Sequence, residues 1–426
     1  MPDNEKQVAP ADKRRFRRGL ARLFIAGILC LHTLFFIDLW PRIKRGYPDF
    51  VVYYTAATIL RDGLGHQLYV EHVQSEVQKR FTGQLPERLA PLPYIHPPAE
   101  ALIFVPLTRL SFLQAFLLWD LINIAILFSV AWLLRMEVSW LRSVPAWEFV
   151  LGCLAFFPVF ESLLQGQDSI LQLLFCVLAW RALKKNADVM AGCWFALGAF
   201  KFQLMLPIVL LIVIWKRKGV LIGFVAVSTM VALTSVGLVG WQGLLHYPTF
   251  ALQIANTPGL GGVPPDFIPN LHGLVMGWPF HLSGAVGTSV VILSSAGLIV
   301  FAAARGQKGE GPENSALHFA LAIAVSDLVG WQTNVHDFSL LVLPLVLIVD
   351  YCLRTPPRQL GNTFALLYPA LPILISPLWF VLWLSVGHMN LMAIPLLWWV
   401  WEVGKEVSCD RNLTLSSGYA GESGVR

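Results

Sequence analysis

Long apolar runs alternate with short charged stretches along most of the chain. The first run extends from Leu20 to Trp40, and comparable runs recur as far as residue 403. A helix needs about 20 mostly apolar residues to cross a bilayer. Counted by run length, the pattern predicts about twelve crossings, with the shorter stretch 99–113 as a re-entrant or surface helix. We therefore expect an all-α, polytopic transmembrane helix bundle.

The Lys/Arg clusters divide the connecting segments into two sets. Clusters such as 13–15 and 216–218 are expected in the cytoplasm, because cytoplasmic loops carry an excess of basic residues. This assignment places both termini in the cytoplasm and the polar motifs on the opposite side. The predicted division is a disordered cytoplasmic tail at 1–19, a single transmembrane domain at 20–404 and a cytoplasmic tail at 405–426.

Two segments depart from simple crossings. The first outer loop contains Tyr69 to Phe81, where charged and apolar residues mix in a helix-like way, which predicts an amphipathic helix on the membrane surface. The runs Val189–Phe200 and Leu204–Trp215 are each too short to cross and are interrupted at Lys201. Irregular backbone at membrane depth is tolerated where it lines a cavity, so we expect this break to face one.

Composition supports a lipid environment. Hydrophobic residues make up 56% of the chain and charged residues 13%, against about 25% charged in soluble domains. The formal net charge of +5 is explained by the basic clusters, so nucleic acid is not an expected partner, whereas the lipid bilayer is. The six cysteines show no CxxC spacing and predict neither a disulfide framework nor a zinc site. Without a GxxxxGK[ST], GxGxxG or HExxH motif, we predict no cofactor and leave a metal requirement open.

Three ionisable residues on the outer side are candidates for chemistry. Asp49 follows the first apolar run and is predicted to be a catalytic base, although it could simply pair with Lys44 or Arg45. Lys201 could neutralise a lipid phosphate, because intramembrane charges are often functional, or it could reach the headgroups. His336 could donate to a phosphate oxygen or be an ordinary interfacial histidine.

Four further residues are predicted to bind a sugar or an acceptor. Tyr53 follows Asp49 closely, and His96 precedes two prolines that keep the chain stiff and extended. Gln167 and Asp168 follow an apolar run, where an amide and a carboxylate would suit sugar hydroxyls. The same residues could instead form only a tight turn between two crossings.

The order of these motifs resembles glycosyltransferase family 87, the polyprenol-phosphate-mannose-dependent mannosyltransferase-like group. The segments that carry the resemblance are residues 49–57, Gly63, Leu68-Tyr69, 94–98, Pro106-Leu107, 118–123, 165–168, 198–201, Pro207 and the turn holding His336. The chain departs from the family pattern at His96, Asp168 and Phe202, where Tyr, Asn and Pro are more usual.

The resemblance implies a GT-C-like fold with an outer cavity, in a bacterial plasma membrane. It further implies an inverting transfer of a hexose, most often mannose, from a polyprenyl-phosphate donor to a lipid-linked or envelope glycan acceptor. Matching Asp49 to the family's early acidic residue makes it the expected general base. Two other hypotheses use the same outer cavity without chemistry: a polyprenyl-lipid carrier or transporter, and a scaffold for envelope assembly.

Overall fold

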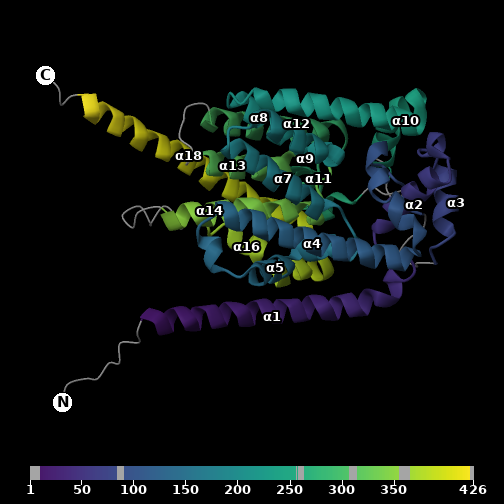
Figure 1. Ribbon diagram of the computed structural model, residues 1–426, viewed down its shortest axis with the longest axis horizontal. Coiled ribbons are helices and arrows are strands. Elements are labelled where there is room, and N and C mark those ends of the chain that lie inside the picture. Colours follow the sequence, from purple (N-terminus) through teal and green to yellow (C-terminus); the bar gives the residue numbers. More distant parts are fainter. Residues whose placement is uncertain are drawn as a thin grey trace, which may run out of the picture.

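The computed structural model describes residues 10–83, 91–255, 257, 263–306, 314–354 and 365–422, and these form helices with no strand among them. Most of the long helices run side by side along the long axis of the molecule (Figure 1). The all-α prediction is therefore confirmed for the described part of the chain.

Helix α1 (Pro10–Ile43) lies along the outside of the bundle (Figure 1). Only 11% of its most apolar stretch is buried against the rest of the protein, so lipid must cover its remaining surface. His32 anchors α1 by stacking on Phe160 with ring centroids 4.1 Å apart. The helix begins within the tail predicted to be disordered, of which residues 1–9 lie outside the described residues.

The segment after α1 is helical, as predicted. It contains α2 (Phe50–Arg61), η1 (Gly65–Gln67), α3 (Glu71–Lys79), η2 (Pro98–Ile103) and η3 (Val105–Arg109). The predicted amphipathic helix is α3, and the stretch 99–113 forms two short 3-10 helices and the start of α4. In Figure 1, α2 and α3 lie at the opposite end of the molecule from the start of α1 and the end of α18.

Two bent helix pairs form the middle of the bundle. The elements here are α4 (Phe112–Glu137), α5 (Ala146–Leu154), α6 (Phe157–Gln165), α7 (Ser169–Lys184), α8 (Asp188–Leu197), η5 (Ala199–Lys201), α9 (Phe202–Ile214) and α10 (Gly219–Ala255). Helices α5 and α6 meet at 77°, and α8 meets the segment after it at 72°. The second bend lies between Leu197 and Ala199, and the short helix η5 that follows it ends at Lys201, so the path is broken close to the predicted position.

Helices α8 and α10 pack with their backbones in close approach. A Cβ atom added at Gly192 would lie 2.0 Å from the Val220 carbonyl oxygen, and one added at Gly223 would overlap the Val189 carbonyl oxygen. Small residues let membrane helices approach in this way. Helix α10 also bends at Gly240, where φ is +74°.

The C-terminal part alternates long and very short helices. They are η6 (Pro265–Phe267), α11 (Leu271–Met276), α12 (Gly284–Gly306), α13 (Asn314–Val329), η7 (Val335–Leu341), α14 (Val342–Arg354), α16 (Ala370–Leu374), α17 (Ser376–Phe380), the π-helical η9 (Val381–Val386), η10 (Met389–Met392) and α18 (Ala393–Glu422). Helix α18 continues through most of the stretch 405–426 that the sequence assigns to a cytoplasmic tail.

Among the described residues, fewer helices reach the length and hydropathy of a membrane crossing than the number of crossings that the sequence predicts. Among the described residues, five helices are long and apolar enough to cross a membrane, or up to seven if each bent pair is one span. The count of about twelve is not confirmed. The count takes the apolar runs on either side of Lys201 as two crossings and gives short apolar helices the same weight as long ones.

Candidate active site

Asp49 lies at the start of α2, directly after the turn that follows α1. Gly46 makes that turn with φ of +92°, a conformation that favours glycine. The Asp49 backbone N–H donates to Gln165 Oε1 at 3.1 Å, and Gln167 Nε2 donates to Asp49 Oδ2 at 3.1 Å. The α6–α7 turn therefore fixes both the backbone and the carboxylate of the predicted base.

Hydrogen bonds to its side chain and to its backbone carbonyl hold Gln167 in one orientation. Its Oε1 accepts a 2.7 Å hydrogen bond from Tyr53 Oη, so its amide nitrogen faces Asp49. Its backbone carbonyl accepts from Trp119 Nε1 at 3.2 Å and from Asn123 Nδ2 at 3.3 Å. Three predicted site residues, Asp49, Tyr53 and Gln167, thus form one hydrogen-bonded chain.

The turn that carries Gln167 depends on Gly166. This residue ends α6 in the left-handed conformation, with φ of 61°. A Cβ atom there would lie 2.7 Å from Phe50 Cβ and 3.0 Å from the Phe116 ring. Glycine satisfies both requirements, because it tolerates positive φ and allows close approach.

Lys201 lies in a buried ion cluster. Its Nζ is 2.9 Å from Asp168 Oδ1, 2.6 Å from Asp337 Oδ1 and 2.7 Å from Ser169 Oγ, and the residue is 3% exposed. The structure therefore brings together Lys201 and Asp168, both predicted site residues. It gives Lys201 two carboxylate partners, so its direct contact with a donor phosphate stays a prediction.

His336 lies between the ion cluster and a cavity. Its Nδ1 is 3.1 Å from Glu161 Oε2, and its Nε2 is 3.6 Å from Asp337 Oδ1. The cavity has a volume of about 230 Å³. Its lining residues are Asp49, Phe157, Glu161, Val263, Phe267, Asn334, Val335, His336, Trp383 and Met389. Two predicted site residues, Asp49 and His336, therefore border the same cavity.

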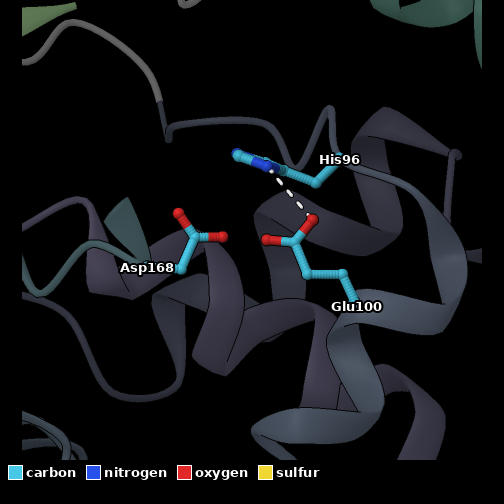
Figure 2. Close-up of side chains that lie close together, drawn as sticks. All are labelled: His96, Glu100 and Asp168. Carbon is cyan, nitrogen blue, oxygen red and sulfur yellow. Dashed lines mark ion pairs between the residues drawn. The ribbon is translucent and has the colours of Figure 1, made fainter. Parts of the chain in front are cut away.

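His96 belongs to a second polar group, together with Glu100 and Asp168. Figure 2 shows the three side chains pointing toward one another, with His96 Nδ1 3.3 Å from Glu100 Oε2. One ligand atom from each residue lies within 4.8 Å of the others, so among the described residues this group could hold a metal ion. His96 also lies against Tyr53, with ring centroids 5.0 Å apart. Two of the departures from the family pattern, His96 and Asp168, thus meet here.

Burial and neighbouring charges perturb this group strongly. Burial lowers the pKa of His96 to about 4, so the imidazole is neutral near pH 7. Burial raises the pKa of Glu100 well above its ordinary value, and the facing Asp168 raises it further. Burial also opposes ionisation of Asp168, but Lys201 outweighs it and holds the pKa of that carboxyl below its usual range. A proton on Glu100 would then donate to Asp168.

Two site residues escape prediction from the sequence. Glu161 borders the cavity and accepts a hydrogen bond from His336, yet it lies inside an apolar run that the sequence pattern predicts to be a crossing. A lone carboxylate within such a run is itself a signal of function. Glu100 follows the two prolines after His96 and lies at the start of a stretch interpreted only by its apolar content.

The comparison with protein families gives one match. A sequence model described as glycosyltransferase family 87 matches residues 94–344. The chain belongs to glycosyltransferase family 87. The matched region is more than half of the 426 residues, and it includes His96, Gln167, Asp168, Lys201 and His336, while Asp49 precedes it. No curated protein and no solved structure matches the chain.

Membership of family 87, together with the apolar helices, identifies a multi-pass membrane glycosyltransferase. Glycan and lipid substrates and a surrounding bilayer fit this class of protein. The sugar, the donor and the role of each residue go beyond the family match.

Proposed function

We propose that this family 87 enzyme transfers a hexose, with mannose as the first candidate, from a polyprenyl-phosphate donor to a lipid-linked or envelope glycan acceptor on the non-cytoplasmic face. The observation that carries the proposal is the shared cavity of Asp49 and His336. A carboxylate and an imidazole on one cavity can serve the two ends of a displacement, the entering hydroxyl and the leaving phosphate.

Asp49 acts as the general base. An acceptor hydroxyl attacks the anomeric carbon, its proton passes to the Asp49 carboxylate, and a new carbon–oxygen bond forms as the bond to the lipid phosphate breaks. One such displacement inverts the anomeric configuration. The hydrogen bond from Gln167 to Asp49 Oδ2 orients the carboxylate at the edge of the cavity.

His336 stabilises the phosphate as it leaves. Negative charge grows on the phosphate oxygens during bond breaking, and a preoriented donor stabilises that charge most in a partly dehydrated cavity. Glu161 accepts from His336 Nδ1 and so fixes the ring plane. To contact the same phosphate, Lys201 would have to leave Asp168 or Asp337. In the structure Lys201 instead pairs with Asp337, which lies beside His336, so it supports His336 indirectly.

The apolar wall of the cavity suits a prenyl chain. Phe157 and Trp383 line the cavity, and Trp383 lies edge-on to Phe35 of α1, with ring centroids 5.4 Å apart. This aromatic surface connects the polar centre with the helix that is most exposed to lipid. A polyprenyl tail could follow it while the sugar phosphate occupies the cavity.

The test is transfer from a radiolabelled polyprenyl-phosphate sugar by purified protein, comparing wild type with Asp49→Asn. General-base catalysis contributes about 10²–10⁴-fold in rate, so we expect kcat to fall by about that factor with little change in melting temperature. The shape of the side chain is kept, which makes folding a minor concern.

The matched control is Asp62→Asn. Asp62 lies at the other end of α2 and pairs with Arg61 and Arg80 at the surface, so its loss leaves transfer unchanged. Transfer at the wild-type rate by Asp49→Asn, at equal protein level, would remove Asp49 as the base. If the wild-type protein forms no labelled product from any polyprenyl-phosphate hexose, the proposed class of donor is wrong.

A further inference from the structure

The group His96, Glu100 and Asp168 has the composition of a metal site. It offers one imidazole and two carboxylates from separate parts of the chain, η2 with its preceding loop and the α6–α7 turn. The ligand atoms lie within 4.8 Å of one another. Ligands bound at about 2.0–2.2 Å stand up to roughly 4.4 Å apart across an ion. The side chains therefore need little movement to meet one cation.

The charge around this group is unbalanced. Glu100, Asp168 and Asp337 are all buried. The Lys201 ammonium contacts Asp168 and Asp337, the His336 imidazole lies 3.6 Å from Asp337, and the His96 imidazole lies 3.3 Å from Glu100. Without a proton on Glu100, the three carboxylates and the Lys201 ammonium would leave two negative charges in a region shielded from water. Buried charges are normally paired or bound to metal. A single divalent cation would bring the group to neutrality.

Two oxygen atoms in the group point to a missing partner. Glu100 Oε1 and Asp168 Oδ2 are buried and find no hydrogen-bond donor among the described residues, and the Glu100 side chain is only 1% exposed. Figure 2 shows the two carboxyl groups directed at each other beneath the His96 ring. Carboxylate oxygens in this arrangement need either a shared proton or a cation between them.

We propose that His96, Glu100 and Asp168 bind a divalent cation, Zn²⁺ or Mn²⁺. The mixed imidazole and carboxylate set favours a first-row transition metal over Ca²⁺ or Mg²⁺, which take oxygen ligands almost exclusively. None of the three residues lines the cavity of Asp49 and His336. The ion therefore serves to join the outer segment to the α6–α7 turn, where Asp168 directly follows the Gln167 that orients Asp49.

The experiment measures ion content and thermal stability, so it does not depend on the glycosyl transfer proposed above. The full chain is purified through a tag without histidine, and bound metals are determined by inductively coupled plasma mass spectrometry. Melting is followed by tryptophan fluorescence after treatment with a chelator and after addition of Zn²⁺, Mn²⁺ or Mg²⁺. We expect about one ion per chain, a melting temperature lowered by chelation, and recovery with Zn²⁺ or Mn²⁺ but not with Mg²⁺.

The variant Glu100→Gln separates the cation from the shared proton. Its amide has the shape of a protonated carboxyl group and can donate to Asp168, so it would replace a proton but not a metal ligand. The proposal expects this variant to lose both the ion and the response to chelator. Glu76→Gln, the same change at an exposed position on α3, keeps both.

Two results would overturn the proposal. One is wild-type protein without a stoichiometric ion and with a melting temperature that no added cation raises. The other is a Glu100→Gln protein that melts at or above the wild-type temperature while retaining the same ion content, because the ion would then lie elsewhere. If Glu100→Gln yields no folded protein, His96→Leu tests the same loss of ion with both carboxyl groups in place.

Discussion

Gln167 and Asp168 are neighbours in the chain, yet they serve two different polar groups. The Gln167 side chain contacts Asp49 and Tyr53, and Asp49 borders the cavity. The Asp168 side chain faces Lys201 and lies beside Glu100, with no exposed surface of its own. The first group is partly open, and its acid is oriented but has room for a substrate. The second is closed, and its charged groups face one another rather than a cavity.

The two groups illustrate two roles of buried polar residues, one in catalysis and one in stability. A group that must react keeps one face toward a cavity and is oriented by neutral partners such as the Gln167 amide. A group whose charges are paired internally holds segments together, because removing one member leaves another charge buried alone. We therefore expect substitutions in the closed group to affect stability first, and substitutions around the cavity to affect turnover first.

The largest effect is expected from Lys201→Met in the closed group. Breaking a buried ion pair costs about 3–5 kcal/mol, and this change leaves Asp168 and Asp337 without their common cation. We expect a large loss of folded protein and of melting temperature in detergent. Lys184→Met is the matched control, because Lys184 pairs with Glu137 at the surface, where such pairs are worth about 0–1 kcal/mol. If both variants lost the same amount of melting temperature, the closed group would contribute no more to stability than a surface ion pair.

An intermediate effect is expected from Glu161→Leu beside the cavity. Glu161 positions His336, and misplacement of a catalytic group by about 1 Å can cost 10²-fold in rate. We expect kcat to fall by about 10–100-fold, while the melting temperature and the KM for the donor change little. Glu161→Gln keeps an acceptor for His336 Nδ1 and should restore most of the rate. If Gln and Leu were equally impaired, the charge of Glu161 rather than its hydrogen bond would matter.

The smallest effect is expected from Tyr53→Phe. It removes the donor to Gln167 Oε1 and leaves a buried oxygen unsatisfied, at a cost of about 1–3 kcal/mol. The freed amide should orient Asp49 less well, so kcat should fall a few-fold. Tyr54→Phe loses a similar 2.7 Å hydrogen bond, to the Leu110 carbonyl, away from the cavity. Its rate per folded molecule should equal wild type, and a matching loss of rate in both variants would argue against the Gln167 contact.

Much of the site could be predicted because polar groups are rare in this chain. Asp49, Gln167, Lys201 and His336 stand out against apolar surroundings, and their placement on one side of the basic clusters predicted that they would meet. The structure joins Asp49 to Gln167 and places Lys201 beside Asp168. It could not be predicted that Gln167 and Asp168 would face different partners, since that depends on the left-handed turn at Gly166.

Other features of the site and fold cannot be predicted from a count of apolar residues. Glu161 and Glu100 each have a partner far away in sequence or across a turn, and no local pattern marks that pairing. Run length presents residues 147–164 as one crossing and the runs on either side of Lys201 as two, whereas the structure has a bent helix pair in each place. Run length measures how apolar a stretch is, whereas the path of the backbone depends on side-chain packing.

The peptide bond between residues 167 and 168 has a consequence for engineering this enzyme. A designer who seeks heat tolerance by repacking the residues around Lys201 would shift the α6–α7 turn, and with it the angle at which Asp49 meets an incoming hydroxyl. Thermal stability and the rate of turnover would then change together. Variants selected only for survival at high temperature should show altered turnover even when every residue that lines the cavity has been left intact.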